Sequence, residues 1–307
     1  PYMLGALVAE TDDGNPDGSP TDKPAIMTAF ERLQDYSGHR FFGTVACELG
    51  AENTAVPAYL AAMADGHLLD ADAAGRAVPE ITHSTYYLNG LDAAPIVMAN
   101  AYGECFICEN VPDDRRAEEI VRALAKISRN DIAVIDHAMD ISELRNALVK
   151  GTLSRAIELG RTLREARNQD RDIAAEIATS GGGYVAFRGQ VTACECRSKE
   201  GFTVGEVAID GCDEWSGHRY KVGIKNENLV SWLDGELHVT IPELICLLNL
   251  DDGDELTNVN HRKGMRVAVV VLPAPEEFTT KSGLAVFGPA YLGLDVKFRP
   301  TVEKSRL

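Results

Sequence analysis

The stretch Phe41–Asp72, FFGTVACELGAENTAVPAYLAAMADGHLLDAD, decides how the first part of this chain folds. Its opening run, Phe41–Cys47, is short and apolar, which is typical of a buried strand. Thr54–Ala64 has the pattern of a helix, and His67–Asp70 that of a second short strand. A strand, a loop, a helix and a strand in this order predict an α/β unit, in which ligands gather where loops leave the carboxyl ends of the strands.

The pattern changes at Thr179–Gly183, TSGGG, from helical spacing to alternating strands. We therefore predict two domains: an α/β layered domain over 1–180, which carries the site, and a β-rich, barrel-like domain over 184–307 whose C-terminal tail packs back on the first. Before the deciding stretch, Thr11–Pro24 predicts a loop that could act as a lid. Ser142–Gln169 predicts two helices with a break at Gly151-Thr152. Strands are expected at 184–191, 201–209, 220–225, 228–233, 237–241, 265–272 and 295–299.

Composition narrows the function classes. The 307 residues carry a formal net charge of −17, which disfavours nucleic acid and anionic membrane surfaces as partners. No apolar run approaches the roughly 20 residues of a membrane helix. The seven cysteines are odd in number and lie mostly in apolar contexts, which favours reduced thiols and a cytoplasmic location.

Acidic side chains cluster where the predicted strands end. Carboxylates and imidazole are ligands that zinc or manganese accepts, and a metal-bound water could attack a polarised carbon. The alternative is structural: the aspartates cap the next helix, and an arginine pairs with a glutamate four residues on. The residues concerned are Glu48, Asp70, Asp72, Arg76, Glu80 and His83.

Cysteine and histidine positions leave several interpretations open. Cys47 ends a predicted buried strand beside Glu48, so it is a candidate thiolate ligand or nucleophile, or a small core residue. The pairs Cys105/Cys108 and Cys194/Cys196 lack partner ligands nearby in the sequence and favour structural roles. His137 ends another predicted strand and is either a ligand or a structural histidine.

An ordered set of short motifs covers most of the chain from about Phe41 onward, and together they resemble the S-methyl-thiohydantoin desulfurase family, whose members are often found beside or fused to hydantoinase/oxoprolinase proteins. The set comprises Glu48-Leu49-Gly50 with Asn53, Asp70–Glu80 (DADAAGRAVPE), Gly151–Ser154 (GTLS), Phe187-Arg188-Gly189, Asn226–Val230 (NENLV), Pro242–Cys246 (PELIC), Leu272–Pro275 (LPAP) and Gly288-Pro289.

The resemblance implies a metal-assisted hydrolase acting on a small thiohydantoin or hydantoin-type ring, with zinc as the expected metal and manganese as the alternative. It implies catalytic roles for Glu48, Asp72 and Arg76: a carboxylate shuttles a proton, and the guanidinium holds a substrate carboxylate. It implies substrate binding by Asn53, Glu80 and Asn228. The metal ligands that we expect are Asp70, Asp72 and His83 of the acidic cluster, with Cys47.

Some features depart from the family pattern. Family members usually carry a glycine-rich segment before the Pro-Tyr that opens this chain, so either that segment is missing from these residues or the site differs. Other functions stay open: an accessory subunit of a hydantoinase-like enzyme, or a small-molecule binding protein. The expected partners are a small-molecule substrate, further copies of the chain in a homo-oligomer, and possibly a hydantoinase-like protein.

Overall fold

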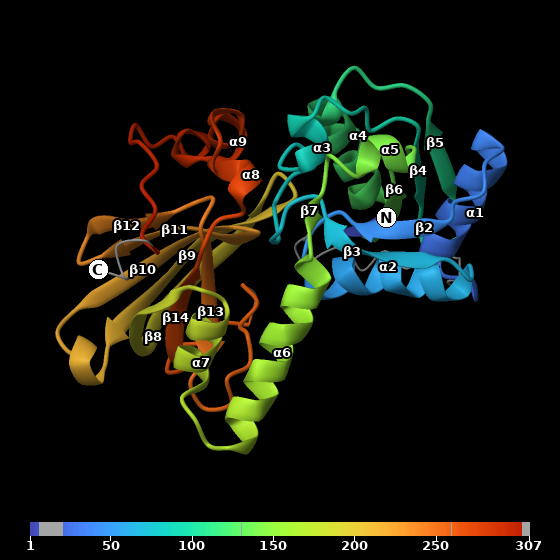
Figure 1. Ribbon diagram of the computed structural model, residues 1–307. Helices are drawn as coiled ribbons and strands as arrows, with labels where there is room; N and C mark the ends of the chain where they lie inside the picture. The colour runs from blue at the N-terminus through green and yellow to red at the C-terminus, as the bar shows by residue number, and fades with distance from the viewer. Residues whose placement is uncertain (6–20, 130, 259, 303–307) are drawn as a thin grey trace. The chain divides into compact units, whose positions relative to one another are not determined.

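A computed structural model describes residues 1–5, 21–129, 131–258 and 260–302 of the chain (Figure 1). The predicted loop at Thr11–Pro24 therefore lies mostly outside the described residues. The chain divides into two compact units: Pro1–Leu153 with Glu200–Phe202, and Ser154–Lys199 with Thr203–Leu307.

The first unit contains two small sheets and the helices that cover them. A four-stranded antiparallel sheet has the order β1-β6-β4-β5. A three-stranded sheet has the order β2-β3-β7. The elements are β1 (Tyr2–Gly5), α1 (Ala25–Ser37), β2 (Gly43–Ala46), α2 (Ala51–Met63), β3 (His67–Asp72), α3 (Thr85–Leu88), β4 (Ile96–Ala99), β5 (Cys105–Cys108), α4 (Asp114–Ile127), β6 (Asp131–Ile135), α5 (Ile141–Leu144) and β7 (Val149–Lys150).

The two central strands of the four-stranded sheet, β4 and β6, are buried on both faces, which explains why they are almost entirely apolar. One face of β4, with Val97 and Ala99, packs against the Phe30 side of α1. The other face, with Ile96 and Met98, packs against α4. Successive side chains of a strand point to opposite faces, so one short strand serves two helix layers.

The three-stranded sheet positions the segment that the motifs single out. β2 and β3 run parallel, as the strand–helix–strand pattern predicts, with Gly43 opposite His67. The register then shifts: Thr44 pairs with Leu68 but Ala46 with Asp72, so β3 carries extra residues there. This irregularity ends the strand with Asp72 buried while Asp70 stays exposed.

The second unit is built on a seven-stranded sheet of order β12-β11-β10-β9-β8-β14-β13. The sheet is curled, so that β11 approaches β13 although the two strands are not neighbours in this order. A hydrogen bond of 2.9 Å from Asn228 Nδ2 to the Ile245 carbonyl oxygen joins them. The elements are α6 (Thr152–Asn168), α7 (Ile173–Ser180), β8 (Tyr184–Lys199), β9 (Phe202–Gly211), η1 (Asp213–Trp215), β10 (Arg219–Lys225), β11 (Glu227–Leu233), β12 (Glu236–Thr240), β13 (Leu244–Asn249), β14 (Arg266–Leu272), α8 (Glu276–Thr279), α9 (Lys281–Phe287) and η2 (Pro289–Leu292).

The expected mixed fold, α/β followed by a curled β-rich part, is confirmed, although individual elements differ from the prediction. Helix α7 packs through Ala174 and Ile177 on Ala268 and Val270 of β14. This packing groups α6 and α7 with the second unit, whereas the sequence placed the domain boundary after them.

Three strands were missed and one was wrongly expected: the short β7 lies within Ser142–Gln169, which was predicted to be helical. β1 and β13 were not predicted; β13, LICLLN, lacks alternation because Ile245 faces the sheet's core while Cys246 faces the α7 side. Residues 295–299 were expected to be a strand but form none, and no described strand pairs with them.

The described end of the chain is held within the second unit. The buried Glu243 carboxylate accepts hydrogen bonds from the Thr301 N–H (2.8 Å), the Thr301 hydroxyl (2.8 Å) and the Val302 N–H (3.0 Å). Residues 303–307 lie outside the described part, so packing of the tail on the first domain stays a prediction.

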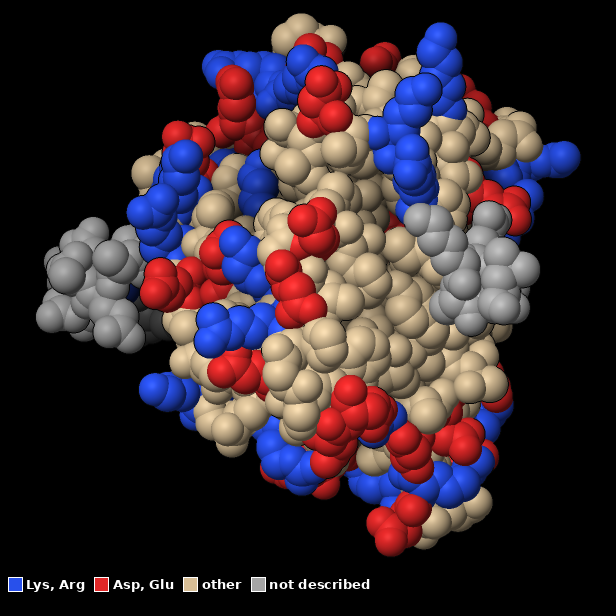
Figure 2. All heavy atoms as spheres, turned by 90° about the vertical axis from the view of Figure 1, so that its left-hand side faces the viewer, with Lys and Arg blue, Asp and Glu red and all other residues tan. Residues whose placement is uncertain are grey.

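On the face shown in Figure 2, acidic and basic side chains are interspersed around a broad uncharged area. The excess negative charge therefore forms no single acidic field on this face. None of the described helices combines the length and apolar character that crossing a membrane requires.

Candidate functional site

Glu48 ties the loop after β2 to the segment after β3. Its Oε1 accepts a 2.7 Å hydrogen bond from Asn53 Nδ2, and its Oε2 a 2.5 Å bond from the Val78 N–H. Burial raises the pKa of Glu48, while the Val78 and Asn53 hydrogen bonds and the nearby Arg76 oppose the rise. Because both carboxylate oxygens already hold the two segments together, the geometry favours positioning by Glu48 over proton transfer.

Asp72 lies at the end of β3 and is fully buried. Its Oδ2 accepts hydrogen bonds from the backbone N–H groups of Ala74 (3.0 Å) and Gly75 (2.7 Å), and Gly75 has φ +68°, which suits glycine. The Thr152 hydroxyl is near enough to lower the pKa of Asp72, yet within the described residues Asp72 Oδ1 makes no well-formed hydrogen bond.

The electrostatics of Asp72 follow from this burial. Burial raises its pKa to about 7; the Ala74 and Gly75 N–H groups oppose the rise, and the Glu48 charge adds to it. A carboxylate that exchanges its proton near neutral pH, with one oxygen available, is suited to general-base chemistry.

The other residues predicted for the site differ in how close they lie to Glu48 and Asp72. Arg76 is buried beside Glu48, and its carbonyl oxygen accepts a 3.4 Å hydrogen bond from the Leu49 N–H. Glu80 lies near Glu118, and its carbonyl oxygen accepts a 3.0 Å bond from the N–H of the buried His83. Asp70 is exposed, and Asn228 belongs to the second unit. The structure thus brings together Cys47, Glu48, Asn53, Asp72 and Arg76.

Cys47 lies among carboxylates. Burial raises the pKa of its thiol well above the usual value, and the charges of Glu48, Asp136 and Asp72 raise it further. The neutral thiol is therefore the resting form, whereas a nucleophile or metal ligand requires the thiolate.

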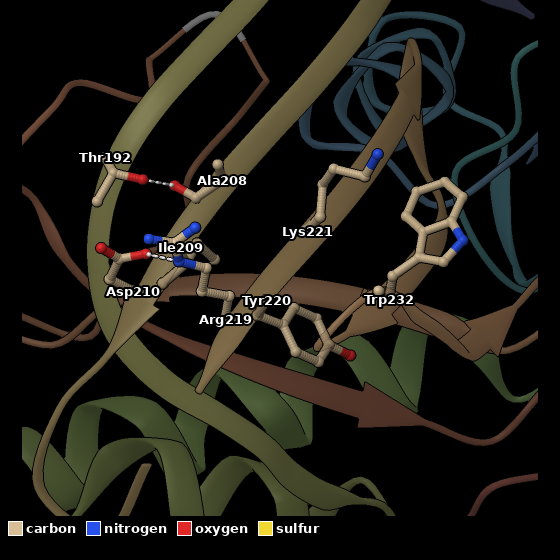
Figure 3. A pocket seen from close by; sticks show the side chains of 9 residues that line it. Thr192, Ala208, Ile209, Asp210, Arg219, Tyr220, Lys221 and Trp232 are labelled. Carbon is tan, nitrogen blue, oxygen red and sulfur yellow. Dashed lines mark hydrogen bonds and ion pairs between the residues drawn. The ribbon is translucent and has the colours of Figure 1, made fainter. Parts of the chain in front are cut away.

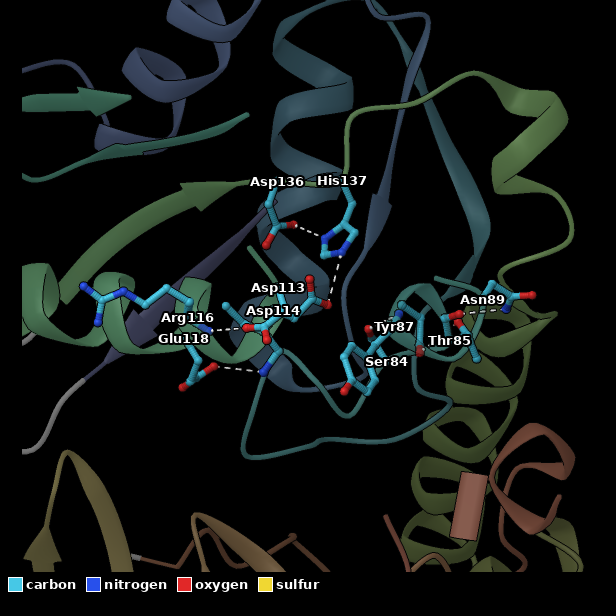
Figure 4. A network of polar contacts seen from close by, with 12 residues as sticks. Ser84, Thr85, Tyr87, Asn89, Asp113, Asp114, Arg116, Glu118, Asp136 and His137 are labelled. Carbon is cyan, nitrogen blue, oxygen red and sulfur yellow. Dashed lines mark hydrogen bonds and ion pairs between the residues drawn. The ribbon is translucent and has the colours of Figure 1, made fainter. Parts of the chain in front are cut away.

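A buried cluster that the sequence had not assembled lies next to Cys47 (Figure 4). His137 Nδ1 lies 3.1 Å from Asp136 Oδ1, and His137 Nε2 lies 3.5 Å from Asp114 Oδ2. The Tyr2 hydroxyl donates a 2.9 Å hydrogen bond to Asp136 Oδ2. The Tyr86 ring stacks on the imidazole, with ring centres 4.7 Å apart. His137 is thus fixed on both ring edges and one face.

The cluster holds a positive charge inside the protein. Burial alone would lower the pKa of His137, but the Asp136 and Asp114 carboxylates raise it to about 9. Burial would raise the pKa of Asp136, yet the adjacent His137 lowers it. His137 also has φ +48°, a strained backbone conformation that persists only where its surroundings hold it in place.

A cavity of about 80 Å³ opens onto this cluster. Cys47, Tyr86, Asp136 and His137 line its polar side, and Phe30 lies on its apolar side. It is below the roughly 300 Å³ at which pockets for drug-sized ligands begin, so it suits a small ligand. One signal in the sequence could have pointed to this cluster: the Asp136-His137 pair at the end of a predicted strand.

The predicted metal ligands do not form a complete set. Among residues 1–5, 21–129, 131–258 and 260–302, no group of three or more His, Cys, Asp or Glu side chains is arranged to hold a metal ion. A catalytic zinc takes three protein ligands, and Asp70 is exposed while Asp72 is buried. The donors of the described residues therefore do not fit a zinc ion.

A larger hollow of about 590 Å³ lies on the sheet of the second unit (Figure 3). Its charged side chains are already paired: Arg219 lies 3.4 Å from Asp210, and Lys221 lies over the Trp232 ring. Its charged side chains are all exposed, so this hollow, unlike the site of the first unit, is lined by no buried charged group.

The fold and the site together define a class of proteins with two units. The first is an α/β unit that holds a buried cluster of carboxylates and an imidazole, and the second is built on a curled β-sheet. Residues 3–110 match the S-Me-THD-like N-terminal domain, and residues 112–301 match the S-Me-THD-like C-terminal domain. The chain therefore belongs to the S-methyl-thiohydantoin desulfurase-like (S-Me-THD-like) family, which confirms the family predicted from the motifs.

Solved structures support this assignment at the level of the fold. A crystal structure of a protein from Chromobacterium violaceum is 25% identical, with a TM-score of 0.76 over 97% of this chain and 82% of that chain. A comparison with curated proteins found no match. The two family domains meet between residues 110 and 112, within the first compact unit.

Proposed function

We propose that this protein is a hydrolase that replaces the sulfur substituent of a small S-methyl-thiohydantoin ring with oxygen from water. The family assignment supports the ring class. The observation that carries the chemistry is Asp72, a buried carboxylate with one oxygen anchored by two backbone N–H groups and the other making no well-formed hydrogen bond within the described residues.

In this proposal Asp72 is the general base. It takes a proton from a water molecule whose oxygen bonds to the ring carbon bearing sulfur, and the proton passes to the ring nitrogen that receives the C=N electron pair. Burial excludes bulk water and keeps the pKa of Asp72 about 7, so the base can take up and release a proton near neutral pH. Glu48 holds the Asn53 and Val78 segments, and Arg76 lies beside it.

The test is release of methanethiol from a synthetic S-methyl-thiohydantoin, followed with a thiol-reactive dye. We expect turnover by the wild type and a loss of about 10²-fold or more in Asp72→Asn, because general-base catalysis contributes about that factor. Asp65→Asn, an exposed aspartate in a turn at φ +52°, is the matched control. No thiol release by the wild type, or full activity in Asp72→Asn, would refute the proposal.

Zinc stays a prediction of the family resemblance and is tested separately. Elemental analysis of the wild type and of Asp72→Ala, without chelators, measures metal per chain. One tightly bound zinc or manganese, lost in the variant, would show that Asp72 is a ligand and would replace the general-base role proposed here.

A further inference from the structure

The buried His137 cluster has features that a purely structural histidine does not require. The imidazole is held between two carboxylates, from the start of α4 and from the end of β6, in a strained backbone conformation. His137 also lines the cavity beside Cys47 and Tyr86. A structural ion pair could be made without strain and without access to a cavity.

The two ring nitrogens are held unequally. Nδ1 lies 3.1 Å from Asp136, whose other oxygen is anchored by the Tyr2 hydroxyl. Nε2 lies 3.5 Å from Asp114 Oδ2, an ion-pair contact that raises the pKa of His137 but is too long for a well-formed hydrogen bond. The Nδ1 side therefore holds the ring more tightly, and the longer Nε2 contact with Asp114 is the one that can be exchanged for another acceptor.

We propose that His137 is the general acid of the reaction and gives its Nε2 proton to the sulfur as the C–S bond breaks. This inference rests on the function proposed above and adds the second proton transfer to it. As the tetrahedral carbon collapses, the C–S electron pair moves to sulfur, the hydroxyl proton goes to Asp72, and the carbonyl of the hydantoin forms. The products are methanethiol and the oxygenated ring, and exchange with solvent returns the proton from Asp72 to His137.

The other titratable side chains at the cavity are unsuited to this role. The pKa of Asp136 is lowered beside His137, so it carries no proton at neutral pH. Burial raises the pKa values of the Cys47 thiol and the Tyr86 phenol well above their usual ranges, which makes both weaker acids. His137, with its pKa raised to about 9 by Asp136 and Asp114, carries a proton at neutral pH and is the strongest proton donor among the cavity's titratable side chains.

The experiment compares leaving groups in the wild type and in His137→Gln. The substrates are the S-methyl, S-ethyl and S-trifluoroethyl thiohydantoins; trifluoroethanethiol is a much stronger acid than the other two thiols, so its departure needs less protonation. The S-ethyl compound controls for size. His218→Gln is the matched variant, because His218 also pairs with an aspartate, Asp234, but is exposed in the second unit.

We expect kcat/KM of His137→Gln to fall about 10²-fold or more for the S-methyl and S-ethyl substrates, and less than about tenfold for the S-trifluoroethyl substrate. These ratios within one variant do not depend on the fraction of protein that is folded. Equal losses for all three substrates, with an active wild type, would overturn the role of His137 and leave the proposed function standing. A wild type that releases no thiol from any substrate would overturn both.

Discussion

Replacing Asp72 by Asn should stabilise the protein at neutral and alkaline pH while removing its general base. The amide oxygen of Asn can accept the hydrogen bonds that the Ala74 and Gly75 N–H groups now give to Oδ2. The amide nitrogen would stand in place of Oδ1, so the change removes a buried charge with little change of shape.

The magnitude follows from the shifted pKa. Burial raises the pKa of Asp72 from 3.8 to about 7, a difference of about 3 units, and each unit corresponds to about 1.4 kcal/mol. Because the folded value exceeds the unfolded value, the stabilisation by Asp72 is fully present below the unfolded pKa and is lost as the pH rises through about 7. The full loss is about 4 kcal/mol, of which about 2–3 kcal/mol falls between about pH 5 and about pH 8.

Urea unfolding at these two pH values, in buffer with a chelator, measures this difference. The free energy of unfolding of Asp72→Asn minus that of the wild type should increase by about 2–3 kcal/mol from about pH 5 to about pH 8, because contributions from other groups cancel. The exposed Asp65→Asn should show no such change. Parallel pH profiles for Asp72→Asn and the wild type would refute the argument that Asp72 is a buried carboxylate with a raised pKa.

Two further substitutions test packing. Gly189→Ala should destabilise the second unit by about 3 kcal/mol or more in urea unfolding, because an added Cβ would lie 2.2 Å from a backbone carbonyl oxygen; Gly160→Ala, within α6, should instead stabilise by up to about 1 kcal/mol. Arg122→Met should lower the free energy of unfolding by about 3–5 kcal/mol, because it leaves the buried Glu118 carboxylate without its ion-pair partner. Arg116→Met, which removes an exposed ion pair, should change it by less than about 1 kcal/mol. Equal effects of either substitution and its control would contradict the packing described here.

Local patterns in the sequence were sufficient to predict the features of the fold and the site that depend on residues close together in the chain. The parallel pairing of β2 with β3 follows from the strand–helix–strand pattern, and that pairing brings Glu48 and Asp72 to one end of the small sheet. The motif Asp70–Glu80 contains the turn residue Gly75 that lets two N–H groups reach Asp72. The difference between Asp70 and Asp72 was not predictable, because it depends on a register shift in β3.

Features that depend on distant packing could not be predicted. β13 has no alternation because it is covered on both faces, and only the curl of the sheet and the placement of α7 create those two faces. The grouping of α6 and α7 with β14 depends on the same kind of packing, because a helical pattern shows which side of a helix is apolar but not which sheet covers it.

The His137 cluster shows most clearly why a site can escape a sequence pattern. Its members come from β1, the start of α4 and the end of β6, and Tyr2 and Asp136 are 134 positions apart. Each residue alone has an ordinary interpretation, as a helix-start aspartate, a strand-end histidine or a core tyrosine. Only the antiparallel pairing of β1 with β6 and the packing of α4 against that sheet place two carboxylates around one imidazole. In the proposed reaction, the base comes from a sequence motif and the acid, with its pKa raised to about 9, comes from distant packing, although both lie near Cys47 and Tyr86.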